Sequence, residues 1–288
     1  MLDTVVAPFA DFEFMRRALV GTVAIAVGGG PVGVFLMLRR MSLTGDAMAH
    51  AILPGAALGY LLAGLSLPAM TIGGLAAGIV VAVLSGLVAR FTELKEDASL
   101  AAFYLLSLAL GVTIVSLRGS NIDLLHVLFG TVLALDDAAL LLLAAIATVT
   151  LLVLAVLYRP LVLECVDPTF LRSVSRAGTP THLIFLALVV LNLVGGFHAL
   201  GTLLAVGMMM LPAAAARFWS ADVTLMTLLA TAIGIASGCA GLLLSYHAEL
   251  PAGPAIILAA GAIYLASLVV GIRGGLLWAA RPGRHLEA

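Results

Sequence analysis

Apolar runs of about twenty residues recur along almost the whole chain, and they constrain its fold more than any other feature. Hydrophobic residues make up 63% of the sequence and charged residues only 10%. A water-soluble domain carries roughly 25% charged residues, so this chain cannot cover itself with a water-facing surface. The runs do not alternate with a period of two, which favours helices over a β-barrel. We therefore predict an all-α, polytopic membrane protein.

The runs predict eight or nine transmembrane helices and no soluble domain, so that residues 1–288 form a single transmembrane domain. A helix needs about 20 apolar residues to cross the bilayer. The segment 200–216 is short and has Pro212 near its end, so it is either a ninth span or a half-helix. The candidate spans are 18–38, 46–64, 69–90, 98–117, 137–158, 181–198, 200–216, 222–245 and 252–272.

The 14 basic residues predict how the spans are oriented, because basic residues concentrate in cytoplasmic loops. If the loop at Arg39 and Arg40 is cytoplasmic and the spans alternate, all basic residues fall inside except Arg16, Arg17 and Arg118. This distribution requires that 121–135 does not cross the membrane. Its length of about 15 residues suits a re-entrant or interfacial helix. We predict an N-terminus outside and a C-terminus in the cytoplasm.

One ionisable pair lies within a predicted span and is the best candidate for a metal site. Asp46 and His50 are four residues apart, so they share one face of a helix. A carboxylate and an imidazole bind divalent cations such as zinc or manganese, whereas a hydrogen bond between the two side chains is the alternative interpretation. Pro54 cannot donate to the His50 carbonyl, which predicts a kink. Two copies of the chain would supply four ligands, the number in tetrahedral zinc sites.

Other ionisable residues give weaker signals. His247 and Glu249 lie in a predicted external loop, where they could receive a cation from an external donor, although a structural role is the simpler interpretation. His182 lies at a polar end and suggests no role. The net charge of −1 gives no indication of nucleic-acid binding, and Cys165 and Cys239 form no metal or disulfide pattern. The sequence has no GxxxxGK[ST] loop and no HExxH motif, so neither a P-loop ATPase nor a zincin-type protease is expected.

A short amphipathic helix is predicted at about 167–178, in the longest polar interval of the cytoplasmic side. Asp167 can cap this helix, Pro168 suits its first position, and Gly178 ends it. A solvated loop helix without a partner is the alternative interpretation. The predicted apolar face is formed by Phe170, Leu171 and Val174.

Five stretches, taken in order, resemble the membrane subunit of bacterial zinc and manganese ABC importers, a family that includes the high-affinity zinc uptake permease. The resemblance covers nearly the whole chain. The stretches are RRMSLTGDAMAHAILPGAALG at 39–59, DLLHVLFGTVLAL at 123–135, DPTFLRSVSRAG at 167–178, GTLLAVGMMMLPAAAAR at 201–217 and LPAGPAIIL at 250–258.

The resemblance implies a non-enzymatic permease of the bacterial inner (plasma) membrane that forms a homodimer in the lipid bilayer. Two copies of a separate cytoplasmic ABC ATPase would drive it, and a periplasmic or surface-anchored binding protein would deliver the metal. Asp46 and His50 match the residues of the family's metal path. Residues 167–178 match the coupling helix that docks into the ATPase, and Asp167, Pro168, Phe170, Leu171 and Gly178 are its candidate coupling residues.

The transported ion is expected to be held only briefly, and no permanently bound cofactor is expected. Zinc is favoured over manganese because two copies give four ligands and because the zinc permeases look most similar. Two other interpretations stay open. One is an ion-coupled secondary carrier in which Asp46 and His50 relay protons, and the other is a siderophore or cobalamin ABC permease of related architecture. An enzyme is not expected, because no catalytic constellation is found.

Overall fold

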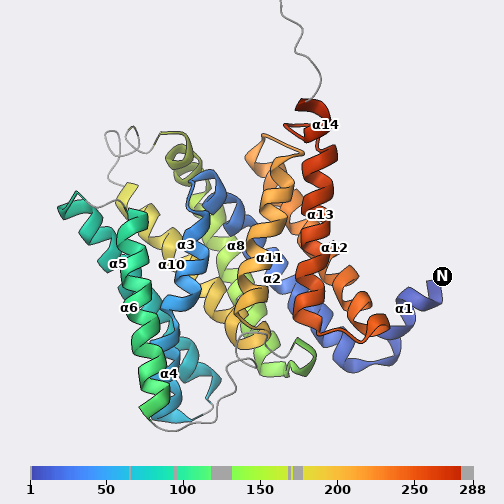
Figure 1. Cartoon of the computed structure of the whole chain (residues 1–288), viewed down its shortest axis with the longest axis horizontal. Helices are drawn as coiled ribbons and strands as arrows, with labels where there is room; N and C mark the ends of the chain where they lie inside the picture. Colours follow the sequence, from blue (N-terminus) through green and yellow to red (C-terminus); the bar gives the residue numbers. More distant parts are fainter. Residues whose placement is uncertain are drawn as a thin grey trace, which may run out of the picture.

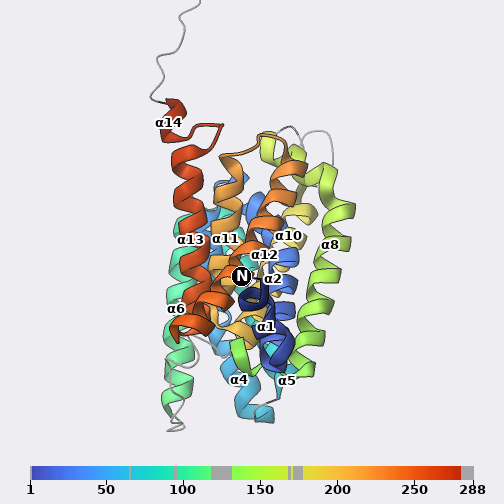
Figure 2. The ribbon, with the colours of Figure 1, turned by 90° about the vertical axis from the view of Figure 1, so that its right-hand side faces the viewer.

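The computed structural model describes residues 2–64, 66–93, 96–117, 132–167, 170 and 178–279. All regular secondary structure within these residues is helical, and the long helices stand side by side as a bundle (Figures 1 and 2). The elements are α1 (Leu2–Asp11), α2 (Glu13–Leu38), α3 (Ser42–Ala51), α4 (Leu53–Ala63), α5 (Leu67–Phe91), α6 (Glu96–Leu117), η1 (Val132–Ala134), α8 (Asp137–Val166), α10 (Gly178–Leu200), α11 (Thr202–Arg217), α12 (Val223–Ala248), α13 (Ala252–Val270) and α14 (Leu276–Ala279).

The described helices confirm the predicted all-α polytopic fold. Seven helical segments are long and apolar enough to cross a membrane, with α3 and α4 counted together as Ser42–Ala63. Two shorter apolar helices, Ala98–Ile114 and Thr202–Arg217, complete a set that matches the nine predicted segments one by one. Several helices keep a wide apolar surface on the outside of the bundle. In α8 and α13 only 28% of the most apolar stretch of 18 residues is buried. Such surfaces suit contact with lipid tails.

One predicted helix boundary is wrong. Helix α8 does not end at residue 158 but continues through Pro160 to Val166. Helix α11 passes through Pro212 and ends at Arg217, close to the end of the predicted segment 200–216. Proline removes one backbone hydrogen bond, and in a packed membrane bundle its neighbours compensate for that loss. The described part of α10 begins at Gly178, three residues before the predicted start of this span. Residues 171–177 lie outside the described residues, so the end of the amphipathic helix at Gly178 stays a prediction.

Contacts between helix ends define two opposite ends of the bundle. At the first, Arg39 after α2 meets Glu164 of α8 and His182 of α10; we call it the Arg39 end. At the second, Arg17 of α2 forms an ion pair of 3.1 Å with Asp137, the first residue of α8; we call it the Arg17 end. Arg40, Arg159, Arg217 and Arg273 lie at or near the Arg39 end, and Arg16 lies at the Arg17 end, so the structure separates these arginines as the sequence predicted.

Residues 118–131 lie outside the described residues. Helix α6, which precedes them, ends at the same end of the bundle at which α8, which follows them, begins. Helix α6 runs parallel to α3 and α4, because Tyr104 lies beside His50 while Gly111, further along, lies beside Pro54. It therefore ends at the Arg17 end, where α8 begins. This arrangement agrees with a segment 121–135 that does not cross. Most of the re-entrant helix predicted there falls outside the described residues, and the part described is the turn η1, packed on α2.

Glycines allow α4 and α5 to approach each other closely. A Cβ atom at Gly55 would lie 1.9 Å from the carbonyl oxygen of Gly73, and one at Gly73 would lie 2.2 Å from the carbonyl oxygen of Gly55. One turn further on, a Cβ atom at Gly59 would lie 2.4 Å from the Ala69 carbonyl oxygen. Small residues four apart allow such backbone contact between membrane helices, and here they fix α4 immediately after the break that follows His50.

Candidate metal-transport site

The candidate site lies on a helix that is broken midway through its span. Helix α3 ends at Ala51 and α4 begins at Leu53, with Pro54 in the first turn of α4. The break agrees with the kink that Pro54 predicts, because proline provides no N–H for the preceding turn. The carbonyl oxygen of Ala51, the last residue of α3, accepts a hydrogen bond of 2.8 Å from Ser107 Oγ on α6. Broken helices of this kind are tolerated in membranes where neighbouring helices satisfy the backbone.

Asp46 and His50 face each other across one turn of α3. Asp46 Oδ1 and His50 Nε2 are 3.9 Å apart, which is too long for a hydrogen bond, so the alternative interpretation of a hydrogen-bonded pair is not realised here. Two ligand atoms that are each about 2.1 Å from a tetrahedral ion are about 3.4 Å apart, so the observed distance is about 0.5 Å longer than a shared ion needs. A small rotation of either side chain therefore allows both atoms to bind one cation.

One side of this pair is packed and the other is open. The His50 ring lies 6.2 Å from the Tyr104 ring, between centroids, and its side chain is 30% exposed. The Asp46 side chain is 67% exposed, and Leu43, one turn earlier on the same face, is also exposed. A carboxylate that faces lipid at the centre of a span costs about 3 kcal/mol on insertion scales. Asp46 lies in the second turn of its span, so this face of α3 favours a polar or protein partner.

Within the described residues, one chain does not complete a metal site. No group of three or more His, Cys, Asp or Glu side chains there could hold an ion. Asp46 and His50 are the two ligands that a single copy offers at this position. A coordination shell of four to six ligands would need water, other groups or a second copy of the chain.

His247 and Glu249 lie far along the chain from this pair, at the turn between α12 and α13 at the Arg17 end. The Nδ1 atom of His247 donates a hydrogen bond of 2.9 Å to the carbonyl oxygen of Leu243 on its own helix. Glu249 ends α12 in a left-handed conformation, with φ of 53°. Both side chains are exposed, so the structure presents them at the surface of that end and does not bring them to Asp46 and His50.

The predicted coupling segment is only partly described. Asp167 accepts a hydrogen bond of 2.9 Å from the backbone N–H of Phe170, the capping contact that the sequence predicts for it. Phe170 is exposed. Pro168 and Leu171, like most of 167–178, lie outside the described residues. The segment leaves α8 at the Arg39 end and returns into α10 at the same end.

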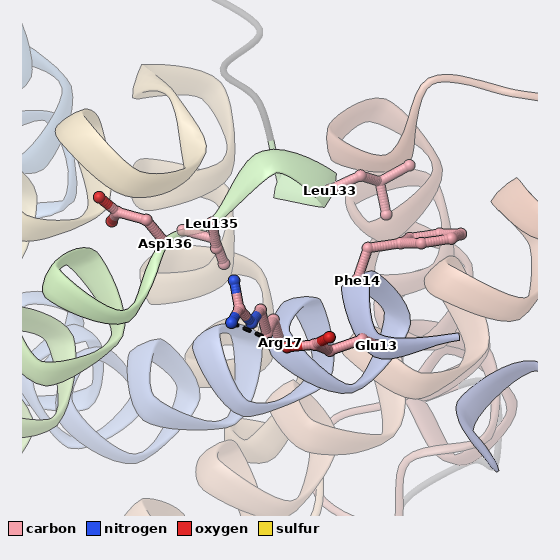
Figure 3. Close-up of a pocket in the computed structure, with 6 residues that line it drawn as sticks. All are labelled: Glu13, Phe14, Arg17, Leu133, Leu135 and Asp136. Carbon is pink, nitrogen blue, oxygen red and sulfur yellow. Dashed lines mark ion pairs between the residues drawn. The ribbon is translucent and has the colours of Figure 1, made fainter. Parts of the chain in front are cut away.

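A cavity of about 390 Å³ lies at the Arg17 end, away from the candidate metal site (Figure 3). Arg17 projects into it and pairs with Glu13 at 2.8 Å. Within the described residues no imidazole lines this cavity, and its Glu13 carboxylate is already paired with Arg17, so this is not where we place the metal. Its lining residues are Glu13, Phe14, Arg17, Leu133, Leu135 and Asp136.

Sequence reasoning missed a buried ionic cluster at the Arg39 end. Arg39 Nη2 donates a hydrogen bond of 2.9 Å to Glu164 Oε1, and the two side chains are 7% and 5% exposed. The same Nη2 atom also contacts His182 Nδ1. Glu164 stands in the apolar run PLVLECV and would have signalled the cluster if α8 had been extended past Pro160. The predicted end at 158 assigned Glu164 to a loop, where an acidic residue attracts no attention.

In the described part of the chain nine apolar helical segments form a bundle, as expected of a polytopic membrane permease. Residues 11–271 match the ABC 3 transport family, and the chain belongs to that family. It is accordingly the permease subunit of an ABC transporter and not itself the catalytic subunit.

Named relatives match over nearly their full length. The manganese import system permease protein ScaB of Streptococcus gordonii is 31% identical over 270 residues, which cover 94% of this chain and 96% of the relative. The manganese transport system membrane protein MntC of Listeria monocytogenes is 31% identical over 268 residues, covering 93% and 94%. The solved structure of PsaBC from Streptococcus pneumoniae in complex with Fab superposes with a TM-score of 0.85 at 28% identity and covers 96% of this chain and 99% of that one.

Proposed function

We propose that this chain is the membrane permease of an ABC importer that carries manganese across the bacterial inner membrane. The observation that carries the proposal is the Asp46–His50 pair, held 3.9 Å apart beside a break in the middle of a membrane span. Discontinuous helices in transporters place ion-binding groups near the middle of the bilayer. Carboxylate with imidazole suits manganese as well as zinc. The printed names of the relatives favour manganese, the alternative to the zinc expected from the sequence.

A homodimer completes the proposed site. Leu43, Asp46 and His50 share one face of α3, and Leu43 and Asp46 are exposed in the single chain. A second copy packed on this face by two-fold symmetry would cover Leu43 and add a second Asp and a second His. The proposed dimer therefore supplies four ligands and removes the exposed carboxylate from lipid.

The two ends of the bundle take different partners in this proposal. The Arg39 end faces the cytoplasm, because basic residues gather on that side, and segment 167–178 docks there into the ABC ATPase. The Arg17 end faces outward, where His247 and Glu249 meet the binding protein that delivers the ion. ATP binding and hydrolysis in the partner would then open the path to one side and close it to the other.

Uptake assays with variants of the pair test the proposed function. We expect Asp46→Asn and His50→Ala to lower manganese uptake at least about tenfold, because each removes a ligand from both copies. The control is Asp11→Asn, which neutralises an exposed carboxylate in α1 and should transport normally. All variants are compared at equal amounts in the membrane. Wild-type uptake in both site variants would overturn the assignment of Asp46 and His50 as metal ligands. Transport of zinc without manganese would overturn the choice of ion.

The same assay separates an ABC permease from an ion-coupled carrier. The purified chain alone, in liposomes with a proton gradient and no ATPase, should not move manganese. Proton-driven transport by the chain alone would contradict the proposal.

A further inference from the structure

The buried cluster of Arg39, Glu164 and His182 joins three parts of the chain that the proposed transport cycle must move together. Glu164 lies in the last turn of α8, just before segment 167–178, and His182 lies near the start of α10, just after it. Arg39 lies between α2 and α3, a few residues before Asp46. The cluster therefore connects both ends of the proposed ATPase-docking segment to the start of the helix that carries the candidate metal ligands.

Arg39 is the central member of the cluster. A guanidinium has only donors, and its Nη2 atom contacts His182 Nδ1. Arg39 Nη2 then bridges the imidazole and Glu164 Oε1, which are 3.7 Å apart and do not bond directly. Glu164 Oε2 is buried and has no hydrogen-bond partner, so this carboxylate keeps an unused acceptor. Phe185 of α10 covers the other side, with its ring centroid 5.0 Å from Arg39 Cζ.

Stability alone is a weak reason for these residues. Apolar side chains of similar volume in place of a buried ion pair are often equally stable or more stable. A buried charged hydrogen bond adds a geometric constraint, because it holds only while donor and acceptor keep their distance and angle. Ionisable residues inside a membrane bundle are for the same reason functional candidates by default.

We infer that Arg39, Glu164 and His182 are positioning residues that transmit movement of segment 167–178 to α3 and thereby couple ATP hydrolysis to release of the ion. The inference rests on the proposed function. When the ATPase displaces the segment, Glu164 and His182 move with its two ends and pull on Arg39. Arg39 changes the position of α3, and with it the distance between the Asp46–His50 pairs of the two copies.

The test measures the number of ATP molecules hydrolysed per manganese ion transported, which a merely structural role of the cluster would not change. The complete complex, with its ATPase and binding protein, is placed in liposomes, and manganese transported and ATP hydrolysed are measured in the same vesicles. We expect Glu164→Gln to raise the ATP hydrolysed per manganese ion at least about fivefold, the lower range of coupling between sites. Manganese binding by the detergent-solubilised complex should stay at the wild-type level. His182→Ala, which removes the imidazole and keeps the Arg39–Glu164 ion pair, is a second variant in case Glu164→Gln does not fold.

Asn192→Ala is the matched control. Asn192 Nδ2 donates a hydrogen bond of 2.8 Å to Thr150 Oγ1, so it links the same two helices, α10 and α8, farther from segment 167–178. Loss of this hydrogen bond should lower thermal stability and leave the ratio of ATP hydrolysed to manganese transported unchanged. A wild-type ratio in the folded Glu164 or His182 variants, or an equal rise in Asn192→Ala, would overturn the inference alone. A wild-type complex that hydrolyses ATP and moves no manganese would overturn the proposed function, and the inference with it.

Discussion

Replacing Gly55 by alanine tests whether the contact of α4 with α5 holds the broken helix in place. The added Cβ atom would stand 1.9 Å from the Gly73 carbonyl oxygen, and real Cβ contacts do not fall below 3.0 Å. The two backbones must therefore separate by about 1.1 Å at this point. Backbone atoms cannot rotate away as a flexible side chain can, so the whole contact region between the helices must shift.

The expected cost is that of an overpacked interior, about 1–3 kcal/mol. Gly86→Ala in the same helix α5 is the matched control, because a Cβ atom there would meet nothing within 4 Å. Alanine is favoured over glycine in helices by about 1 kcal/mol, so this control should be neutral or stabilising. Thermal unfolding of the purified protein in detergent measures both changes. Gly55→Ala should lower Tm and Gly86→Ala should not.

The reasoning requires that Gly55→Ala lower Tm and that Gly86→Ala leave it unchanged or raise it. Equal Tm values for Gly55→Ala and the wild type would mean that α4 and α5 are not in backbone contact. A Tm lowered equally by both alanines would mean that any added methyl group in this part of the protein is harmful. In either case the close approach described for Gly55 and Gly73 would be refuted.

Two further variants test smaller contacts. Ser107→Ala leaves the Ala51 carbonyl without its 2.8 Å donor and should cost about 0.6–1.7 kcal/mol; Tm should fall, and manganese uptake should fall with it because the break lies beside His50. Asp222→Ala removes the cap of α12, a bond of 2.8 Å to the Leu225 N–H, and should lower Tm by an equivalent of about 0.5–2 kcal/mol while uptake per folded molecule stays normal. An unchanged Tm in either variant would contradict its assigned contact.

The positions of the spans follow from the sequence because the bilayer sets one length for all of them. An apolar run of about twenty residues can be recognised without knowing its neighbours. Helix ends are less predictable, as α8 shows. Pro160 suggests an end, yet the helix continues to Val166 because packing and membrane surroundings outweigh one missing hydrogen bond. That error alone concealed Glu164.

The candidate functional residues also include a pair that the sequence predicts and a cluster that it does not. Asp46 and His50 are four residues apart, so their common face depends on local helix geometry and can be predicted. The cluster joins Arg39 to Glu164 and His182, which lie 125 and 143 positions further along the chain, and only the packing of α2, α8 and α10 brings them together. No spacing in the sequence encodes such a meeting.

Within the described residues one chain supplies only Asp46 and His50 at this position, and a site that is not closed suits the proposed transport. An ion that must be released cannot be held in a closed shell of fixed ligands. In the proposed dimer each copy contributes Asp46 and His50, so the number of protein ligands depends on the distance between two α3 helices. Helices held together would present four ligands, and helices moved apart would present two. A modest displacement of α3 would thereby turn a binding site into a releasing one without changing any residue, which gives the ATPase a mechanical way to control affinity.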